Sequence, residues 1–211
     1  MDKLENLDKV KINSTYLKEE VVLEMKEFFE SEGFIQLNDF FEEKWINETK
    51  NFLLKCEFVL DYKPIFYRRK SLEVKNQFNL NVILLTEYFK SKEFLNYLEE
   101  ITEFELEFSE LKVNIYSHKD FTLLNDKNKQ EECLDVIFDL SDDFNENMGG
   151  RLTYIVKDEE VFYLDPTFNT LTVLYKSEEV LKYLKYINNK AKTNKILRFE
   201  ISFNFASDLE I

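Results

Sequence analysis

The sequence has few of the residues on which common metal, redox and phosphate-binding sites depend. Its 211 residues include 1 His, 2 Cys, 2 Pro and 3 Gly. One histidine supplies at most one imidazole ligand, and no glycine-rich phosphate-binding loop is present. Cys56 and Cys133 fit no spaced metal or redox motif, and a zinc site built from them and His118 would lack a fourth ligand. We therefore expect two reduced, buried thiols.

Long apolar runs and a signal-peptide pattern are also absent. No run approaches the ~20 residues that a membrane span needs, and the chain does not open on a secretory leader. Hydrophobic residues still make up 44% of the sequence and aromatic residues 16%, which is too apolar for a disordered chain. The length fits one domain with a sizeable core. The sequence thus favours a soluble, cytoplasmic protein.

Positive charge is scarce relative to negative charge. The sequence contains 28 Lys and Arg against 42 Asp and Glu, which gives a formal net charge of −14. This excess argues against a surface that wraps nucleic acid as a whole, and it favours basic protein partners.

The spacing of apolar residues predicts helices in the first half of the chain and strands in the second. Residues 1–32 are expected to be helical, with Gly33 as the C-terminal glycine. Asn38 and Asp39 are expected to cap a second helix, and a third covers about residues 80–101. Residues 63–70 are expected to be extended, and residues 177–184 to form a short helical turn. Strands are expected at residues 34–37, 113–116, 134–140, 152–156, 161–164, 171–175 and 197–205.

Five short stretches form a recognisable series. They are FIQLNDFF at 34–41, NIY at 114–116 with KDFTLL at 119–124, VIFDL at 136–140 with GGRL at 149–152, PTFNTL at 166–171, and RFEIS at 198–202. In this order they resemble the 2-oxoglutarate/Fe(II) dioxygenases of the prolyl-4-hydroxylase type. The group they resemble most is that of the eukaryotic prolyl hydroxylases that modify a small-subunit ribosomal protein and are linked to translation termination.

The resemblance implies an α+β fold. Its centre would be a double-stranded β-helix, or jelly roll, with N-terminal helices packed against it as a buttress. We expect residues 1–32 to form an N-terminal helical segment and residues 33–211 to form the dioxygenase-like jelly-roll domain.

The same resemblance locates an iron site, but the ligand residues are replaced. The family binds ferrous iron through two histidines and one carboxylate. The matching positions here carry Asn125, Lys127 and Lys182, and an ammonium in place of a carboxylate repels a dication. Arg198 does match the arginine that grips 2-oxoglutarate. We therefore expect a pseudoenzyme with no catalytic residue, no metal and no required cofactor, while 2-oxoglutarate binding through Arg198 stays open.

A second H-x-D sequence lies earlier in the chain. It consists of His118, Lys119 and Asp120 and lies seven positions before the position that matches the family's ligand site. An active hydroxylase with unorthodox iron ligation through His118 and Asp120 is the alternative this motif suggests. It is limited by ligand number, because the chain has no second histidine.

Two segments concentrate the basic residues. The first, at 63–70, interleaves cations with Phe66 and Tyr67, and the second has no acid between Glu179 and Glu200. Basic residues beside aromatic ones suit phosphate contact and base stacking. The candidate partner-binding residues are Lys63, Arg68, Arg69, Lys70, Lys185, Lys190, Lys192 and Lys195.

The leading hypothesis is a catalytically inactive dioxygenase-fold protein that acts as a binding factor. Its expected partners are ribosomal proteins and ribosomal RNA, with no membrane partner. An active prolyl hydroxylase and an iron-free dicarboxylate sensor that uses Arg198 are the alternatives.

Overall fold

The computed structural model describes residues 10–72, 79–123, 132–141, 144–156, 159–191 and 193–206, with the side chains of 159–161 excepted. The helices are α1 (Glu19–Glu32), α2 (Glu43–Leu53), α3 (Leu80–Phe89) and α4 (Lys92–Thr102), with short 3-10 helices η2 (Ser14–Leu17), η4 (Glu146–Met148) and η5 (Asn189–Ala191). The strands are β1 (Phe34–Leu37), β2 (Phe58–Lys63), β3 (Tyr67–Leu72), β4 (Leu106–Tyr116), β5 (Phe121–Thr122), β6 (Cys133–Asp139), β7 (Leu152–Val156), β8 (Glu159–Leu164), β9 (Thr170–Lys176), β10 (Leu181–Leu184) and β11 (Ile196–Phe205).

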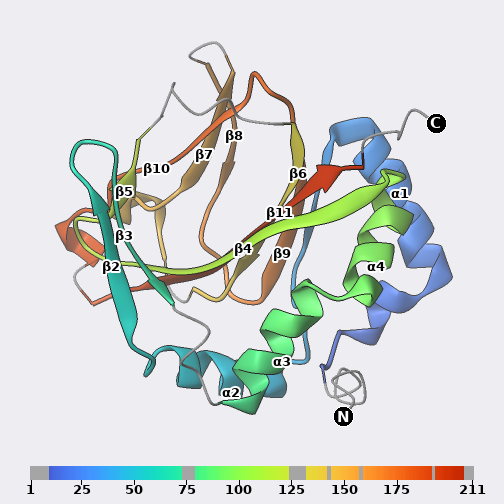
Figure 1. Cartoon of the computed structure of the whole chain (residues 1–211), viewed down its shortest axis with the longest axis horizontal. Helices are drawn as coiled ribbons and strands as arrows, with labels where there is room; N and C mark the ends of the chain where they lie inside the picture. Colours follow the sequence, from blue (N-terminus) through green and yellow to red (C-terminus); the bar gives the residue numbers. More distant parts are fainter. Residues whose placement is uncertain are drawn as a thin grey trace.

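The strands form two antiparallel sheets. The large sheet has the order β1-β9-β6-β11-β4-β3-β2, with β5 paired to β3, and the small sheet has the order β10-β7-β8. The helices gather at one side of the large sheet (Figure 1). The expected α+β jelly roll with N-terminal helices is therefore confirmed.

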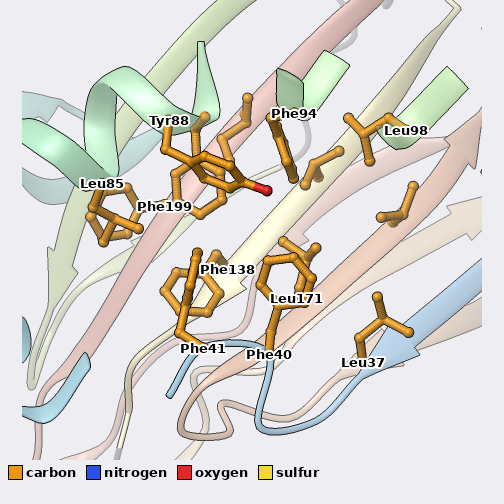
Figure 2. Close-up of a cluster of buried hydrophobic side chains, with 14 of the residues drawn as sticks. Leu37, Phe40, Phe41, Leu85, Tyr88, Phe94, Leu98, Phe138, Leu171 and Phe199 are labelled. Carbon is orange, nitrogen blue, oxygen red and sulfur yellow. The ribbon is translucent and has the colours of Figure 1, made fainter. Parts of the chain in front are cut away.

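Side-chain alternation along the central strands gives the large sheet two different faces. On β11, Leu197, Phe199 and Ile201 belong to the core shared with the helices. That core is rich in aromatic rings, and Figure 2 shows residues of α3, α4 and the β1–α2 connection packed on the sheet. The labelled side chains are Leu37, Phe40, Phe41, Leu85, Tyr88, Phe94, Leu98, Phe138, Leu171 and Phe199. Burial of these rings stabilises the helical layer on the sheet, at roughly 25 cal/mol for each Å² of apolar surface removed from water.

The opposite face of the large sheet packs on the small sheet. Tyr116, Ile137 and Ile196 from the large sheet form a second buried cluster with Leu152 and Leu184 from the small one. The space between the two sheets is the interior of the jelly roll.

The N-terminal helix packs on the same core. Val22, Met25 and Phe29 of α1 are buried in the cluster that also contains the strands. Gly33 ends α1 in the left-handed conformation at φ 71°, and its N–H donates to the carbonyl of Phe29 at 2.8 Å, as expected.

Several local predictions were wrong. Asn38 and Asp39 do not cap α2, which begins at Glu43 after Glu42, because the Asn38 side chain instead accepts a hydrogen bond from Thr170. The single helix expected at 80–101 is two helices, because the Ser91 hydroxyl accepts from the Phe94 N–H and starts α4. Helix in the first 32 residues is limited, within the described part, to α1 and the turn η2.

The expected helical turn at 177–184 was also wrong. Residues Leu181–Leu184 form strand β10, which pairs with Leu152–Ile155 of β7. Pairing with a neighbouring strand overrides a weak local helical preference. The extended conformation expected at 63–70 is only partly correct. Lys63 ends β2 and residues 67–70 belong to β3, but residues 64–66 form the turn between the two strands, where Ile65 has a positive φ of 73°.

In the described part of the chain, no helix is both long enough and apolar enough to cross a bilayer.

Alanine substitutions at Gly149 and Gly33 compare a glycine that lies against neighbouring backbone with one that has open space around it. Both have positive φ, but a Cβ on Gly149 would lie 2.0 Å from the carbonyl oxygen of Tyr186, whereas one on Gly33 meets nothing within 4 Å. Gly33→Ala should lower the free energy of unfolding by about 1 kcal/mol. Gly149→Ala should cost about 3 kcal/mol or more, because steric overlap adds to the backbone strain. Urea denaturation measures both losses, and equal losses would contradict the close approach.

Candidate functional site

Polar side chains from both sheets meet in the jelly-roll interior. The alternation that sends Leu197 and Phe199 toward the helices sends Arg198 and Glu200 to the other face. We call these side chains the interior polar network, in which the Arg198–Asp139 pair acts electrostatically on the group around Glu200. Its members are Asn114 and Tyr116 of β4, Asp135 and Asp139 of β6, Tyr154 of β7, Lys182 of β10, and Arg198 and Glu200 of β11.

Arg198 is completely buried and bound to a carboxylate of the chain itself. Its Nε donates to both oxygens of Asp139 at 3.1 Å, and its Nη2 donates to Oδ2 at 2.8 Å. The two residues are direct neighbours across β11 and β6. Burial raises the pKa of Asp139, and Arg198 opposes that rise. A bidentate, charge-assisted pair of this kind fixes the guanidinium in one orientation.

Glu200 lies at the centre of the network. Its Oε1 accepts hydrogen bonds from the Tyr116 hydroxyl and, at 2.9 Å, from the Asn114 side-chain amide. Burial acts to raise its pKa, but Lys182, the Tyr116 hydrogen bond and Arg198 together lower the pKa to about 2. Glu200 is therefore a stable anion in the folded protein.

Lys182 connects the small sheet to the large one. Its Nζ donates to the Asp135 oxygens at 2.9 and 3.1 Å and lies 3.7 Å from Oε2 of Glu200. The Tyr154 hydroxyl donates to Asp135 at 2.7 Å. Burial acts to lower the pKa of Lys182, but Asp135 and Glu200 outweigh it and raise that pKa. The side chain is thus an ammonium held by two carboxylates.

The network is compatible with burial because its charges are paired. Two cations meet three carboxylates, and hydroxyl and amide donors satisfy further oxygens. Breaking such a pair by removing one partner costs about 3–5 kcal/mol, since the remaining charge stays buried.

One buried nitrogen of the network has no hydrogen-bond partner within the described residues. It is Nη1 of Arg198. An unpaired buried donor costs about 1–3 kcal/mol, so a small polar group would be stabilised beside it.

The residues expected at the iron positions have different outcomes. Asn125 and Lys127 lie outside the described residues. Lys182 lies in the interior polar network, as an ammonium. Among the described residues, no three His, Cys, Asp or Glu side chains form a group that could hold a metal ion.

The alternative H-x-D sequence lies in the turn after β4. The Asp120 carboxylate is buried, pairs with Arg68 at 2.9 Å and accepts from the Ser117 N–H at 2.8 Å. Lys119 adopts a positive φ of 77° in that turn. The imidazole of His118 lies edge-on to Tyr186. Asp120 therefore has a structural role that orients the turn.

Both cysteines are free thiols. Cys133 is buried and Cys56 is half-buried, so the expected burial is complete only for Cys133. Burial raises the pKa of both thiols, which reduces their reactivity.

The first basic segment forms the turn of the β2–β3 hairpin and the adjoining part of β3, and its cations differ in their surroundings. Arg68 pairs with Asp120, and Arg69 pairs with Asp61 at 2.9 Å and lies over the Tyr67 ring. The ammonium of Lys63 lies over the ring of Phe66 at 4.8 Å.

The two basic segments meet on one surface. Lys70 of the first and Lys195 of the second line the same pocket of about 140 Å³, together with Ser117. The turn at residues 117–120 joins the segments, because Ile187 exchanges backbone hydrogen bonds with Lys119 and Asp120 at 2.9 and 3.0 Å. We call this surface the basic face. Lys190 is exposed on η5 and Lys185 is half-buried, whereas Lys192 lies outside the described residues.

Most of the interior polar network was not recognised from the sequence. A usable signal is nevertheless present in the sequence. Asp135 and Asp139 lie four positions apart in one buried strand, and Arg198 and Glu200 lie two positions apart in another, so each pair points to one face of its strand. Charges at alternate positions of a strand with apolar residues between them indicate a polar interior face.

The fold and the sequence place the chain among the 2-oxoglutarate/Fe(II) oxygenase folds of the prolyl hydroxylase type. Structures with this fold include a Pseudomonas putida prolyl-4-hydroxylase (TM-score 0.63, 13% identity, covering 88% of this chain and 99% of that one). A second is a Trichoplax adhaerens prolyl hydroxylase in complex with a hypoxia-inducible-factor peptide (TM-score 0.61, 12% identity, covering 95% and 94%). At these identities the likeness concerns the fold alone.

Residues 66–210 match the family described as the oxoglutarate and iron-dependent oxygenase degradation C-term, and the chain belongs to this family. Mouse prolyl 3-hydroxylase OGFOD1 is 32% identical over 74 residues, which cover 34% of this chain and 14% of the relative. The Xenopus laevis protein of that name is 32% identical over 82 residues, which cover 36% and 16%. The chain therefore matches only a small part of these curated relatives.

The described residues do not fit ferrous iron at the position of Lys182. A metal ligand there must donate a lone pair, whereas Lys182 is protonated and already bound to Asp135. Nη1 of Arg198 has no hydrogen-bond partner among the described residues, whereas Nε and Nη2 both donate to Asp139.

Glu200 gives the network a specific pH dependence. Its pKa is lowered from 4.5 to about 2 in the folded protein, so between these values the unfolded chain binds more protons. Its contribution is present above pH ~4.5 and lost as the pH falls toward ~2, and it amounts to about 3 kcal/mol. Urea denaturation from pH 2 to 6 should show a steeper acid loss in the wild type than in Glu200→Gln.

The matched control is Glu107→Gln, which removes an exposed carboxylate from β4. This variant should keep the slope of the wild type. An identical acid slope in the wild type and in Glu200→Gln would contradict the buried-anion assignment.

Proposed function

We propose that this chain is a catalytically inactive member of the oxygenase fold that acts as a binding factor in the cytoplasm. The observation that carries the proposal is the interior polar network. Lys182 and Arg198 bind carboxylates of the chain itself, at 2.9 and 2.8 Å. These contacts support the proposal, because the interior cations are already paired with carboxylates of the chain itself.

The basic face is the surface we assign to the binding function. It concentrates cations on a protein whose formal net charge is −14. Lys70 and Lys195 line one pocket from two distant segments, and Phe58 of β2 lines the same pocket. Lysines near aromatic rings suit phosphate contact and base stacking.

The partner we propose is the ribosome, with ribosomal RNA at the basic face and ribosomal proteins nearby. Support comes from the similarity to prolyl 3-hydroxylase OGFOD1 and from the resemblance to hydroxylases of a ribosomal protein. The similarity covers a small part of those relatives. The proposed partner is therefore based on the cations of the basic face as well as on this similarity.

An iron-free dicarboxylate sensor is the second candidate. The unpaired Nη1 of Arg198 favours it, because a carboxylate that reached the interior would satisfy this donor. An active hydroxylase has less support, because Asp120 is held by Arg68 and Lys182 is an ammonium.

Sedimentation of native extract tests the ribosomal proposal. The protein should co-migrate with ribosomal particles at low salt and move to the light fractions as salt rises, because phosphate contacts are screened. Lys70→Glu/Lys195→Glu should lose co-migration at low salt.

The control variant is Lys44→Glu/Lys92→Glu, which makes the same charge change at exposed positions on α2 and α4. It should sediment like the wild type. A light, salt-indifferent wild-type fraction would contradict the proposal, as would equal losses in the two variants.

A further inference from the structure

A groove outside the jelly-roll interior and the basic face lies where α1, α4, β9 and β11 approach one another. Two adjacent depressions share Glu103, Phe104 and Tyr175 in their walls, and enclose about 330 and 600 Å³. Figure 1 shows the start of β4 and the end of β11 beside α1. We call the joined depressions the acidic aromatic groove.

Three aromatic rings form the floor of the larger depression. The ring centroids of Phe104 and Phe205 are 4.9 Å apart, and Tyr175 lies 5.8 and 5.9 Å from them. All three side chains are half-buried. Each packs on the main core with one part and leaves another part at the surface. The face of an aromatic ring attracts cations.

Carboxylates form the rim. Glu103, Glu105 and Glu132 line the larger depression and are exposed. The Tyr175 hydroxyl donates to Glu132, which raises the pKa of that tyrosine and orients the carboxylate at the edge of the ring. Among the described residues that line the two depressions, the one cation is Lys26, which pairs with Glu103 at 2.5 Å.

The position of Lys26 illustrates what the groove can hold. Its stem lies at the wall of the smaller depression while its ammonium binds a rim carboxylate. Long basic side chains combine an apolar stem with a charged head in the same way. In the larger depression the aromatic floor and two further carboxylates offer these contacts to a side chain from outside.

We propose that the acidic aromatic groove binds an extended basic segment of a partner protein, with an arginine or lysine side chain over the aromatic floor. The rim carboxylates receive the charged head, and the rings contact its stem or its guanidinium plane. This inference does not depend on the proposed RNA contact, because it uses different elements and the opposite charge.

Fluorescence anisotropy with a labelled Gly-Arg-Gly-Arg-Gly-Arg-Gly peptide and the full chain tests the groove. Wild-type protein should bind the peptide saturably at low salt. The variant Glu105→Gln/Glu132→Gln should raise the Kd by about fivefold to tenfold, as two partly exposed charge pairs are lost. Phe205→Leu should also weaken binding, because it removes one ring from the floor.

The control is Glu48→Gln/Glu87→Gln, which removes two exposed carboxylates from α2 and α3. When the titrations are repeated at ~0.1 M salt, where the Debye length is ~10 Å, this control should change the Kd by less than about twofold, because charges far from the groove are then screened. Equal weakening in the two double variants would show general attraction to an acidic protein and would overturn the proposal. Absence of saturable binding by the wild type would overturn it as well.

Discussion

The ion pair between Arg198 and Asp139 depends on the alternation of side chains along two central strands. β11 and β6 each present one row of side chains to the helices and the other to the jelly-roll interior. Apolar residues fill the first row, which allows the helices to pack as a dry aromatic layer. Charged residues occupy the second, where Arg198 and Asp139 face each other across the strands. A slip of one residue in either strand would bring these charges into the aromatic core, so the pairing register and the charge network stabilise each other.

The overall architecture was readable from the sequence because it depends on long apolar patterns. Helices with three- and four-residue spacing and strands with alternating spacing gave the α+β fold, and the five motifs identified its type. Details decided by tertiary contact were not readable. Residues 181–184 form a strand because they pair with β7. The Asn38 side chain accepts a hydrogen bond from Thr170 and does not cap a helix. Local preference differs too little between the alternatives to decide such cases.

The functional site also contains residues that the sequence identified and residues that it did not. Arg198 and Lys182 were identified by resemblance, and the structure places both in one network. Their carboxylate partners were missed, since the partners come from other strands and a contact between distant residues leaves no local motif. Asn125 and Lys127 lie outside the described residues, so their role remains a prediction. The charge distribution shows a similar pattern: the basic segments were visible in the sequence, but their meeting at Lys70 and Lys195 required the fold.

The central claim is that the chain's own carboxylates hold the interior cations of this oxygenase fold. Calorimetric titration with 2-oxoglutarate, with and without ferrous iron under anaerobic conditions, tests it most directly. The account predicts no saturable binding at millimolar co-substrate, because Asp139 already holds Arg198 and Asp135 holds Lys182. Saturable one-site binding that disappears in Arg198→Met would contradict it, and would mean that this arginine serves a ligand.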